Sequence, residues 1–355
     1  MKMRKSKWGK AGIILTGVCC WCLALCFLTK IEQKAGCFNG YFSSPAVTCG
    51  EVRRFQEQSQ KPEMLPEITA WSKEEGQQIC GKIRESVTED VWKLSGNMEH
   101  FFAGSLAGGN YPWEEDEEGC MISTALAEKL FGTQRIEGMQ IEIAGEEYWI
   151  RGCVKSREAF AAIHAEKEEV MQGIFLSYED RSVSGSSAKN LLGQIVGREP
   201  DGFWEGNLYS AAARVVVTIP AWVLAVVCVS GGWSLTGRIT DFRLRLVIKL
   251  TVAAGICALT AFGLGVTFRF SPDYLPAMWS DLEFFPGLIE KKWGEFQNVC
   301  QFALCPGDAG MLATFRNIMF AVAGSLLSAV NISADIKAVL IQQCQNRFEP
   351  DDPSE

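Results

Sequence analysis

Histidine is nearly absent from this sequence, since His100 and His164 are the only two among 355 residues. Neither stands beside cysteines at the spacing of a zinc site, and the lone C-x-x-C pattern, Cys19–Cys22, has no second pair to complete one. The catalytic patterns G-x-S-x-G and H-E-x-x-H are missing as well. We therefore expect no enzyme activity, no bound metal and no cofactor in this chain.

Nucleotide-binding and calcium-binding patterns are present only in incomplete form. Residues 76–83 match the phosphate-binding pattern G-x4-G-K, but Ile83 stands where serine or threonine would supply a hydroxyl to Mg²⁺. The acidic run at residues 114–118 lacks the alternating acids and glycine turn of a calcium loop. We interpret the first match as coincidental and the second stretch as a solvated loop.

A basic excess is also lacking, because 34 Lys and Arg stand against 42 Asp and Glu and give a net charge of −8. This balance disfavours nucleic acid as a partner. The mean hydropathy of +0.06 is high for a chain with 21% charged residues, so the apolar residues must be concentrated in blocks. The composition predicts a membrane protein with a soluble part and excludes the disordered, collagenous and cytosolic-globular classes.

Four apolar blocks are long enough to cross a bilayer as helices. We place the predicted transmembrane helices at residues 11–29, 211–229, 250–268 and 311–332. Arg214 and Arg316 lie near span ends, where we expect their side chains to reach the headgroups. Pairs of small residues four apart suit helix contacts in a dimer but are also common in any membrane helix; they are Ala254/Ala258, Ala261/Gly265 and Gly324/Ser328.

The distribution of Lys and Arg next to the spans predicts the orientation of the chain. The N-terminus, residues 1–10, carries five basic residues and no acid, and the link at residues 230–249 carries four basic residues and one acid. Both are therefore expected in the cytoplasm, together with the tail at residues 333–355. Residues 30–210 and 269–310 then lie outside, as a domain and a loop, in a multi-pass protein of the plasma membrane. The first span is longer than a signal-peptide core and no A-x-A-like site follows it, so we interpret it as an anchor.

The external domain is predicted to be an α+β unit. Residues 30–206 contain 18 Lys and Arg and 30 Asp and Glu, a net charge of −12. Ser123 or Thr124 caps a predicted helix that ends at Gly132, and alternating residues around Gly145-Glu146 predict a β-hairpin. Further predicted elements are strands at residues 67–71, 86–94 and 173–178 and a helix at residues 188–196. The fold class is thus an α-helical membrane protein with four transmembrane helices and an α+β extracytoplasmic domain.

Seven of the fourteen cysteines fall outside the membrane under this topology. Cys120 and Cys153 occupy apolar positions next to strands, where a free thiol acts as a small hydrophobe. Cys37 with Cys49, and Cys300 with Cys305, are close enough in sequence to form disulfides, but spacing alone leaves both pairings open.

The middle of the external domain carries a recognisable pattern. It runs through residues 118–123 (EGCMIS), 126–132 (LAEKLFG), 138–145 (GMQIEIAG) and 148–154 (YWIRGCV). These residues resemble the MacB-like periplasmic core domain of ABC transporter permeases of the MacB/FtsX-like type, in which a strand, a helix and a hairpin of the form G-x-x-I-x-I-x-G-x-x-Y-x-I-x-G-x-V follow one another. The order of one span, a large external domain and three further spans also resembles that family.

The resemblance implies a permease subunit that works with a separate cytoplasmic ABC ATPase, as a homodimer or as a heterodimer with a second permease. The link departs from the family pattern because it lacks the R-x-x-E-I-G-type segment that lies against the ATPase. Its apolar residues alternate with arginines and could insert into a groove on a partner, or the arginines could only hold the orientation. The candidate coupling residues are Arg238, Phe242, Arg243, Leu244 and Arg245.

The sequence is compatible with two functions from different classes. The first is a permease-type subunit that couples the ATPase to the external domain for export or mechanotransmission. The second is a membrane-anchored extracytoplasmic receptor or sensor without ATPase coupling. An external hydrolase ranks below both for want of a nucleophile–base pair.

Overall fold

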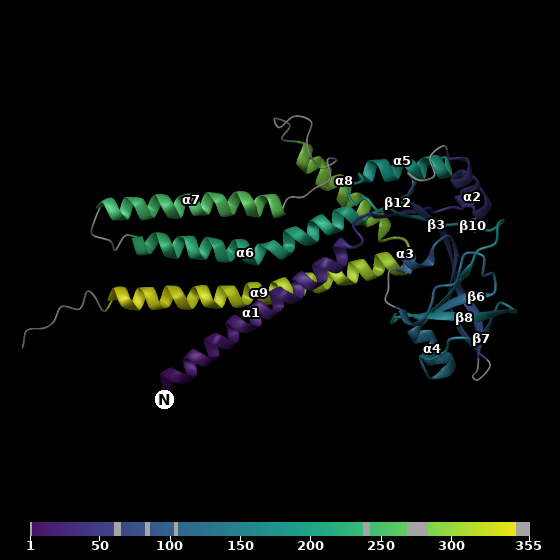
Figure 1. The fold of residues 1–355 in the computed structure, drawn as a ribbon, viewed down its shortest axis with the longest axis horizontal. Helices are drawn as coiled ribbons and strands as arrows, with labels where there is room; N and C mark the ends of the chain where they lie inside the picture. The colour runs from purple at the N-terminus through teal and green to yellow at the C-terminus, as the bar shows by residue number, and fades with distance from the viewer. Residues whose placement is uncertain are drawn as a thin grey trace, which may run out of the picture. The chain divides into compact units, whose positions relative to one another are not determined.

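The computed structural model describes residues 2–59, 65–81, 86–102, 106–236, 242–267, 274 and 283–345. The chain divides into two compact units (Figure 1). The helical unit comprises residues 1–33, 208–269 and 313–355, and the β-rich unit comprises residues 34–207 and 270–312. The chain therefore passes between the units four times.

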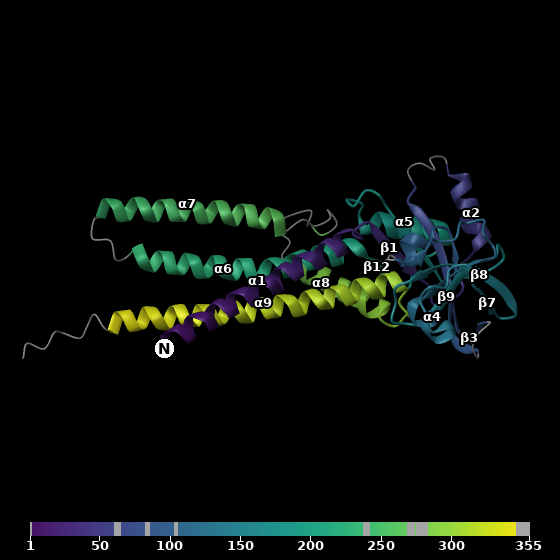
Figure 2. The same cartoon turned by 60° about the horizontal axis from the view of Figure 1, so that its bottom comes forward.

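Four long helices supply the helical unit (Figure 2). They are α1 (Lys2–Glu32), α6 (Gly206–Thr236), α7 (Phe242–Thr267) and α9 (Pro306–Gln345). Each predicted span lies within one of these helices, apart from residue 268, which is outside the described residues. Among the described residues, two helical segments are long and apolar enough to cross a membrane, Gly12–Glu32 and Pro306–Asn331.

Polar and small residues join the helices of this unit. Arg214 lies 2.6 Å from Glu32 in an ion pair between α6 and α1. A Cβ atom on Gly17 would lie 2.7 Å from Ser328, and one on Gly324 would lie 3.2 Å from the thiol of Cys20. The Gly324/Ser328 pair thus serves a contact between α1 and α9 within one chain, so it no longer argues for a dimer.

A mixed sheet of ten strands forms the β-rich unit. The order is β12-β1-β11-β3-β4-β9-β6-β8-β5, and β7 pairs with both β3 and β8, so the pairings of β3, β4, β9, β6, β8 and β7 close a circuit. Only β4 with β9 and β6 with β8 are parallel pairs within these registers. The strands are β1 (Cys37–Tyr41), β3 (Glu67–Gly81), β4 (Val87–Ser95), β5 (Leu106–Gly109), β6 (Gly119–Ser123), β7 (Gln140–Ile143), β8 (Glu146–Val154), β9 (Phe160–His164), β11 (Gly173–Ser177) and β12 (Gly202–Glu205); β2 (Val47–Thr48) and β10 (Val170–Met171) pair separately.

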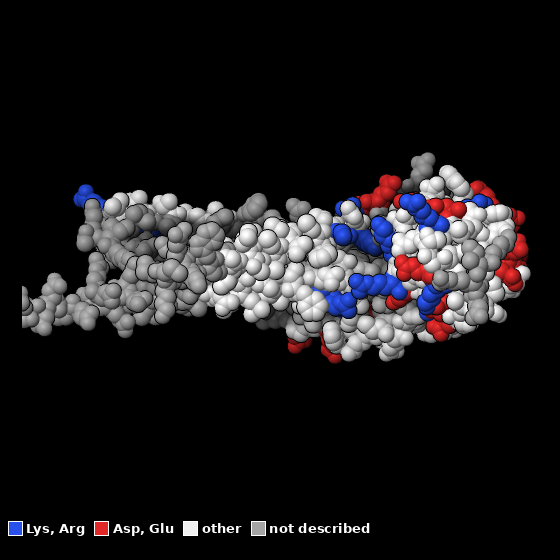
Figure 3. All heavy atoms as spheres, turned by 90° about the horizontal axis from the view of Figure 1, so that it is seen from below, with Lys and Arg blue, Asp and Glu red and all other residues white. Residues whose placement is uncertain are grey.

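Two clusters of buried apolar side chains lie in the part of this unit that the structure describes. We call them the α4 core and the α5 core after the helices that contribute to each. The helices of the unit are α2 (Cys49–Gln58), α3 (Met98–Phe102), α4 (Thr124–Phe131), α5 (Gly185–Val196) and α8 (Phe284–Val299). The α4 core draws on residues 79–163, and the α5 core draws on residues 38–203. In Figure 3 charged side chains of both signs gather over the β-rich unit, whereas the described surface of the long helices is mostly uncharged.

The α4 segment agrees closely with its sequence. Ser123 caps α4 by accepting a hydrogen bond from the backbone N–H of Leu126, and Gly132 ends it in the left-handed conformation with a φ of 69°. The predicted hairpin is formed by β7 and β8, although its turn is Ala144-Gly145, one residue earlier than predicted. Both turn residues have positive φ, which matches the twist of a tight hairpin.

Several other elements differ from expectation. The predicted strand at residues 67–71 continues as β3 through Gly81. Gly76 stands at a bulge with a φ of 66°, and residues 77–81 belong to the strand, so these residues form no phosphate-binding loop. The run after Gly197 contains strand β12. The segment 269–310, which we placed outside the membrane as a loop between two spans, contains α8, and residues 270–310 group with the β-rich unit. Cys37, Cys49, Cys300 and Cys305 are free thiols, so neither of the two local disulfides forms.

Candidate functional site

The last residues of the predicted coupling link, from Phe242 to Lys249, form the start of α7. Phe242, Arg243 and Leu244 are exposed there, and Phe242 and Leu244 leave 66% and 52% of their surface uncovered. Arg238 lies outside the described residues, and the side chain of Arg245 is likewise not described. The structure thus places three of the five candidates on one exposed first turn.

A second group of functional side chains is buried in the β-rich unit around Asp308. Asp308 stands in the first turn of α9 and is 3% exposed. Its carboxylate accepts hydrogen bonds from the Tyr41 hydroxyl at 2.5 Å and from the Asn39 amide at 2.8 Å. The Asn39 amide nitrogen also lies 3.2 Å from the Cys305 sulfur, and its carbonyl oxygen accepts from the Trp71 indole N–H at 2.9 Å. We call these five residues the Asp308 network.

Strand geometry explains why Asn39 and Tyr41 point the same way. Side chains alternate across a strand, so Asn39 and Tyr41 share one face of β1, while Phe38 takes the opposite face and joins the α5 core. Burial, followed by the charge of Asp308, raises the pKa of Tyr41 well above its ordinary value. Tyr41 therefore stays protonated and remains a hydrogen-bond donor to Asp308.

A buried carboxylate at Glu205 organises a second network. Glu205 ends β12 and is 3% exposed. It accepts hydrogen bonds from the Tyr274 hydroxyl and from the Lys292 ammonium, the latter at 2.7 Å. Lys292 also lies 2.9 Å from Glu295 on α8. Burial lowers the pKa of Lys292, but its attraction and hydrogen bonds to Glu205 and Glu295 outweigh burial and leave the pKa raised, so Lys292 stays charged. We call these four residues the Glu205 network.

Both networks stand next to the points where the chain passes between the units. Asn39 follows the first passage, at residues 33–34, by only a few residues, Glu205 precedes the passage at 207–208, and Asp308 precedes the passage at 312–313. Buried donors and acceptors that lose their partners cost free energy, so these networks hold β1, β12, α8 and the start of α9 together as one body.

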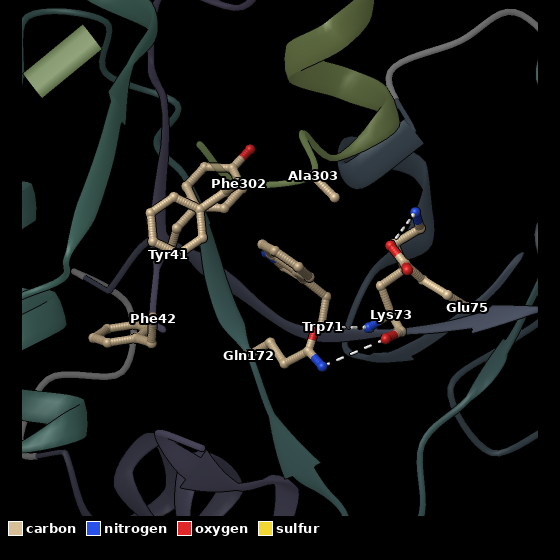
Figure 4. A pocket seen from close by; sticks show the side chains of 8 residues that line it. All are labelled: Tyr41, Phe42, Trp71, Lys73, Glu75, Gln172, Phe302 and Ala303. Atoms are coloured by element: carbon tan, nitrogen blue, oxygen red, sulfur yellow. Dashed lines mark hydrogen bonds and ion pairs between the residues drawn. The ribbon is translucent and has the colours of Figure 1, made fainter. Parts of the chain in front are cut away.

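A pocket of about 320 Å³ adjoins the Asp308 network (Figure 4). Tyr41, Trp71 and Phe302 form its aromatic side, and Lys73, Glu75 and Gln172 form its polar edge. The Lys73 ammonium lies 2.7 Å from Asp90 and 3.3 Å from Glu75, so two carboxylates offset its charge. The rings of Tyr41 and Trp71 line the pocket and also belong to the Asp308 network, so a shift of either ring would alter both.

Burial raises the pKa of the Cys305 thiol, which belongs to the Asp308 network, well above its ordinary value, so this thiol stays protonated. Within the described ranges, no three or more His, Cys, Asp or Glu side chains are grouped to bind a metal. His100 lies 2.8 Å from Glu67, and Arg151 binds Asp116 of the acidic run at 2.7 Å. Burial raises the pKa of Cys37 to about 11, which keeps this thiol protonated and unreactive near neutral pH.

Comparison with known proteins finds similarity among solved structures only. The sequence matches no protein-family model and no curated protein. The periplasmic region of MacB from Actinobacillus actinomycetemcomitans is similar, at 12% identity and a TM-score of 0.39, over 48% of this chain and 89% of that chain. The extracellular domain of the noncanonic ABC-type transporter YknZ from Gram-positive bacteria is similar, at 14% identity and a TM-score of 0.37, over 46% of this chain and 95% of that chain. Both TM-scores are below 0.5.

Sequence reasoning missed both networks. Asn39, Glu205 and Asp308 belong to no motif and are isolated polar residues near the ends of apolar stretches. No local signal marked Asp308, because an acid just outside a predicted span can be solvated, and its burial appears only in the structure. The partners come from segments more than 260 residues apart, as for Asn39 and Asp308, and no local pattern encodes that distance.

Proposed function

We propose that this chain is the permease-type membrane subunit of an ABC transporter, which couples a separate cytoplasmic ATPase to an extracytoplasmic domain for export or mechanotransmission. The observation that carries the proposal is the pair of buried carboxylate networks beside the chain passages between the two units. The resemblance of residues 118–154 to the MacB-like core domain and the predicted order of spans support it. In this proposal the chain has four transmembrane helices, cytoplasmic termini and a dimeric assembly with itself or a second permease.

The proposed mechanism follows from the energetics of the networks. A displacement of α9 that separated Asp308 from Tyr41 and Asn39 would leave buried donors unsatisfied, at a cost of about 1 to 3 kcal/mol for each group. Moving the β-rich unit as a body avoids that cost. Motion begun at the cytoplasmic ends of the helices would thus be delivered to the β-rich unit rather than lost at the joint.

The decisive experiment changes the coupling link and leaves the orientation signal intact. The double variant Phe242→Ser with Leu244→Ser keeps the arginines of the link. We expect it to abolish co-purification of the ATPase and stimulation of ATP turnover, because an apolar insertion into a partner groove is removed. The matched control is Trp113→Ser with Val170→Ser, which removes two exposed apolar side chains from the β-rich unit and should leave both readouts unchanged. Persistent co-purification in the correctly inserted link variant would refute this contact.

The orientation is tested separately with a membrane-impermeant thiol reagent on intact cells. Cysteines introduced at Glu115 and Gly287 should react, and those introduced at Arg243 and Pro350 should not. Labelling at position 243 from outside would overturn the proposed topology.

A receptor or sensor without an ATPase is the second candidate. The net charge of −12 over residues 30–206 and the aromatic pocket beside the Asp308 network favour it. Recovery of an ABC ATPase with the chain from detergent supports the permease; a chain that signals without any ATPase supports the sensor.

A further inference from the structure

Helix α8 presents more apolar surface than the β-rich unit covers. Its inner face packs against β12, with Val299 buried and Lys292 bound to Glu205. Phe285, Ile289 and Trp293 follow one another at intervals of four residues and are 45%, 69% and 59% exposed. Residues four apart lie on one side of a helix, so these three form a continuous stripe beside the buried face. We call it the α8 stripe.

The stripe is unusual within its own unit. Elsewhere in the described part of the β-rich unit, the exposed large apolar residues are Trp113, Trp149 and Val170, which lie on separate segments. On α8 itself the outward polar residues, such as Glu290 and Lys291, point away from the stripe, because they follow Ile289 by about 100° and 200° around the helix. The exposed part of α8 therefore carries an apolar stripe on one side and polar residues on the other.

We propose that the α8 stripe contacts lipid at the extracytoplasmic surface of the membrane, with α8 lying in the headgroup region. The placement of residues 269–310 outside the cell, made in the proposed function, underlies this inference. Helices with aromatic and aliphatic residues on one face and polar residues on the other lie in this way at bilayer surfaces, and tryptophan is enriched there.

Chain length brings α8 within reach of the bilayer. Six residues, 300–305, separate its end from the start of α9, and a chain of that length spans at most about 20 Å. The Asp308 network fixes the first turn of α9 in the same unit as α8, and the fourth predicted span begins at residue 311. The stripe thus belongs to the part of the β-rich unit nearest, along the chain, to a membrane entry point.

The size of the stripe argues against a second copy of the chain as its occupant. Three half-exposed side chains offer roughly 300 Å² of apolar surface, taking about 150 to 250 Å² for a whole aromatic side chain. A stable protein interface buries about 800 Å² on each partner. A lipid surface needs no such minimum, because the same helix is already tethered by α9.

Photo-crosslinking in native membranes tests the proposal on the full chain. Ile289 is replaced by p-benzoylphenylalanine, and Lys291, on the opposite side of the same helix, is replaced in a matched control. After illumination, mass spectrometry should find phospholipid adducts at position 289 at least five-fold above those at position 291. The same probe at Leu327, an exposed position of α9, calibrates the yield in the span.

Each other outcome rejects lipid as the occupant. A covalent dimer of this chain formed from position 289 would assign the stripe to a second copy, and an adduct with another protein would assign it to a partner. Equal lipid yields at positions 289 and 291, or none at 289 while Leu327 reacts, would also overturn the inference. The thiol labelling at Gly287 reports on topology independently, so a failure of the proposed orientation is distinguishable from a failure of this contact.

Discussion

The two cores of the β-rich unit differ in how they are assembled. The α4 core takes its buried residues from one stretch of the chain, residues 79–163. The α5 core takes Phe38 from β1 and Phe203 from β12, which lie next to passages into the helical unit. On the sheet face opposite Phe38, β1 also carries the residues that hold Asp308. The comparison teaches that one core forms from a single continuous stretch, whereas the other needs residues from both ends of the stretch 38–203.

The largest expected effect lies in the α4 core. Leu126 and Leu130 are fully buried on α4, so replacing either by alanine should reduce the free energy of unfolding by about 2 to 5 kcal/mol. Lys129→Ala, an exposed position on the same helix, should change it by about 0.5 kcal/mol or less. Chemical denaturation of the full chain in detergent, followed by hydrogen exchange in β6 and β8, measures the effect. Equal stability of the leucine and lysine variants would mean that the α4 core carries little of the fold.

Sequence patterns predicted the α4 region well because its determinants are local. A cap at Ser123, a left-handed glycine at position 132 and alternation in β7 and β8 are all set by residues within a few positions of one another. Strands β1, β9 and β12 were missed, because they are short and largely buried and so show no polar alternation, and β6 was implied only by the family resemblance. The exposed start of α7 could be anticipated from its charges, whereas the two networks depend on contacts between distant segments.

An intermediate effect is expected where β1 meets the first turn of α9, on the sheet face opposite the α5 core. Asp308→Ala removes the acceptor for Tyr41 and Asn39, and unsatisfied buried donors of this kind cost about 1 to 3 kcal/mol. We expect a smaller loss of unfolding free energy than in Leu130→Ala but a larger loss of ATPase stimulation. Tyr41→Phe removes one donor and leaves the Asn39 bond, so it should show a fraction of both effects. With equal amounts of folded protein, a loss of ATPase stimulation in Leu130→Ala but not in Asp308→Ala would contradict this distinction between the two regions.

The smallest expected effect concerns acid sensitivity near the boundary of the two cores. His164 ends β9 opposite Leu94 of β4, and its neighbours Ile163 and Ala165 belong to the α4 and α5 cores. Burial lowers the pKa of His164 from its ordinary value of 6.5, against the opposing influence of the Leu94 carbonyl and of Glu114 and Asp116. The unfolded chain therefore binds a proton at His164 more readily than the folded chain does.

The contribution of neutral His164 to the free energy of unfolding should consequently be fully present above about pH 6.5. It should be lost progressively as the pH falls from that value to the folded-state pKa. The variant His164→Gln lacks this titration, whereas His100→Gln removes the exposed histidine that pairs with Glu67 and serves as the matched control. The unfolding free energy should fall between pH 7.5 and pH 5.5 in the unaltered protein. We expect this fall to be smaller in His164→Gln and unchanged in His100→Gln. Because both cores flank His164, hydrogen exchange at pH 5.5 should increase together in β9, which contributes to the α4 core, and in β11, which contributes to the α5 core. An increase confined to one core would show that the two unfold independently, and an unchanged pH dependence in His164→Gln would assign the acid sensitivity to other groups.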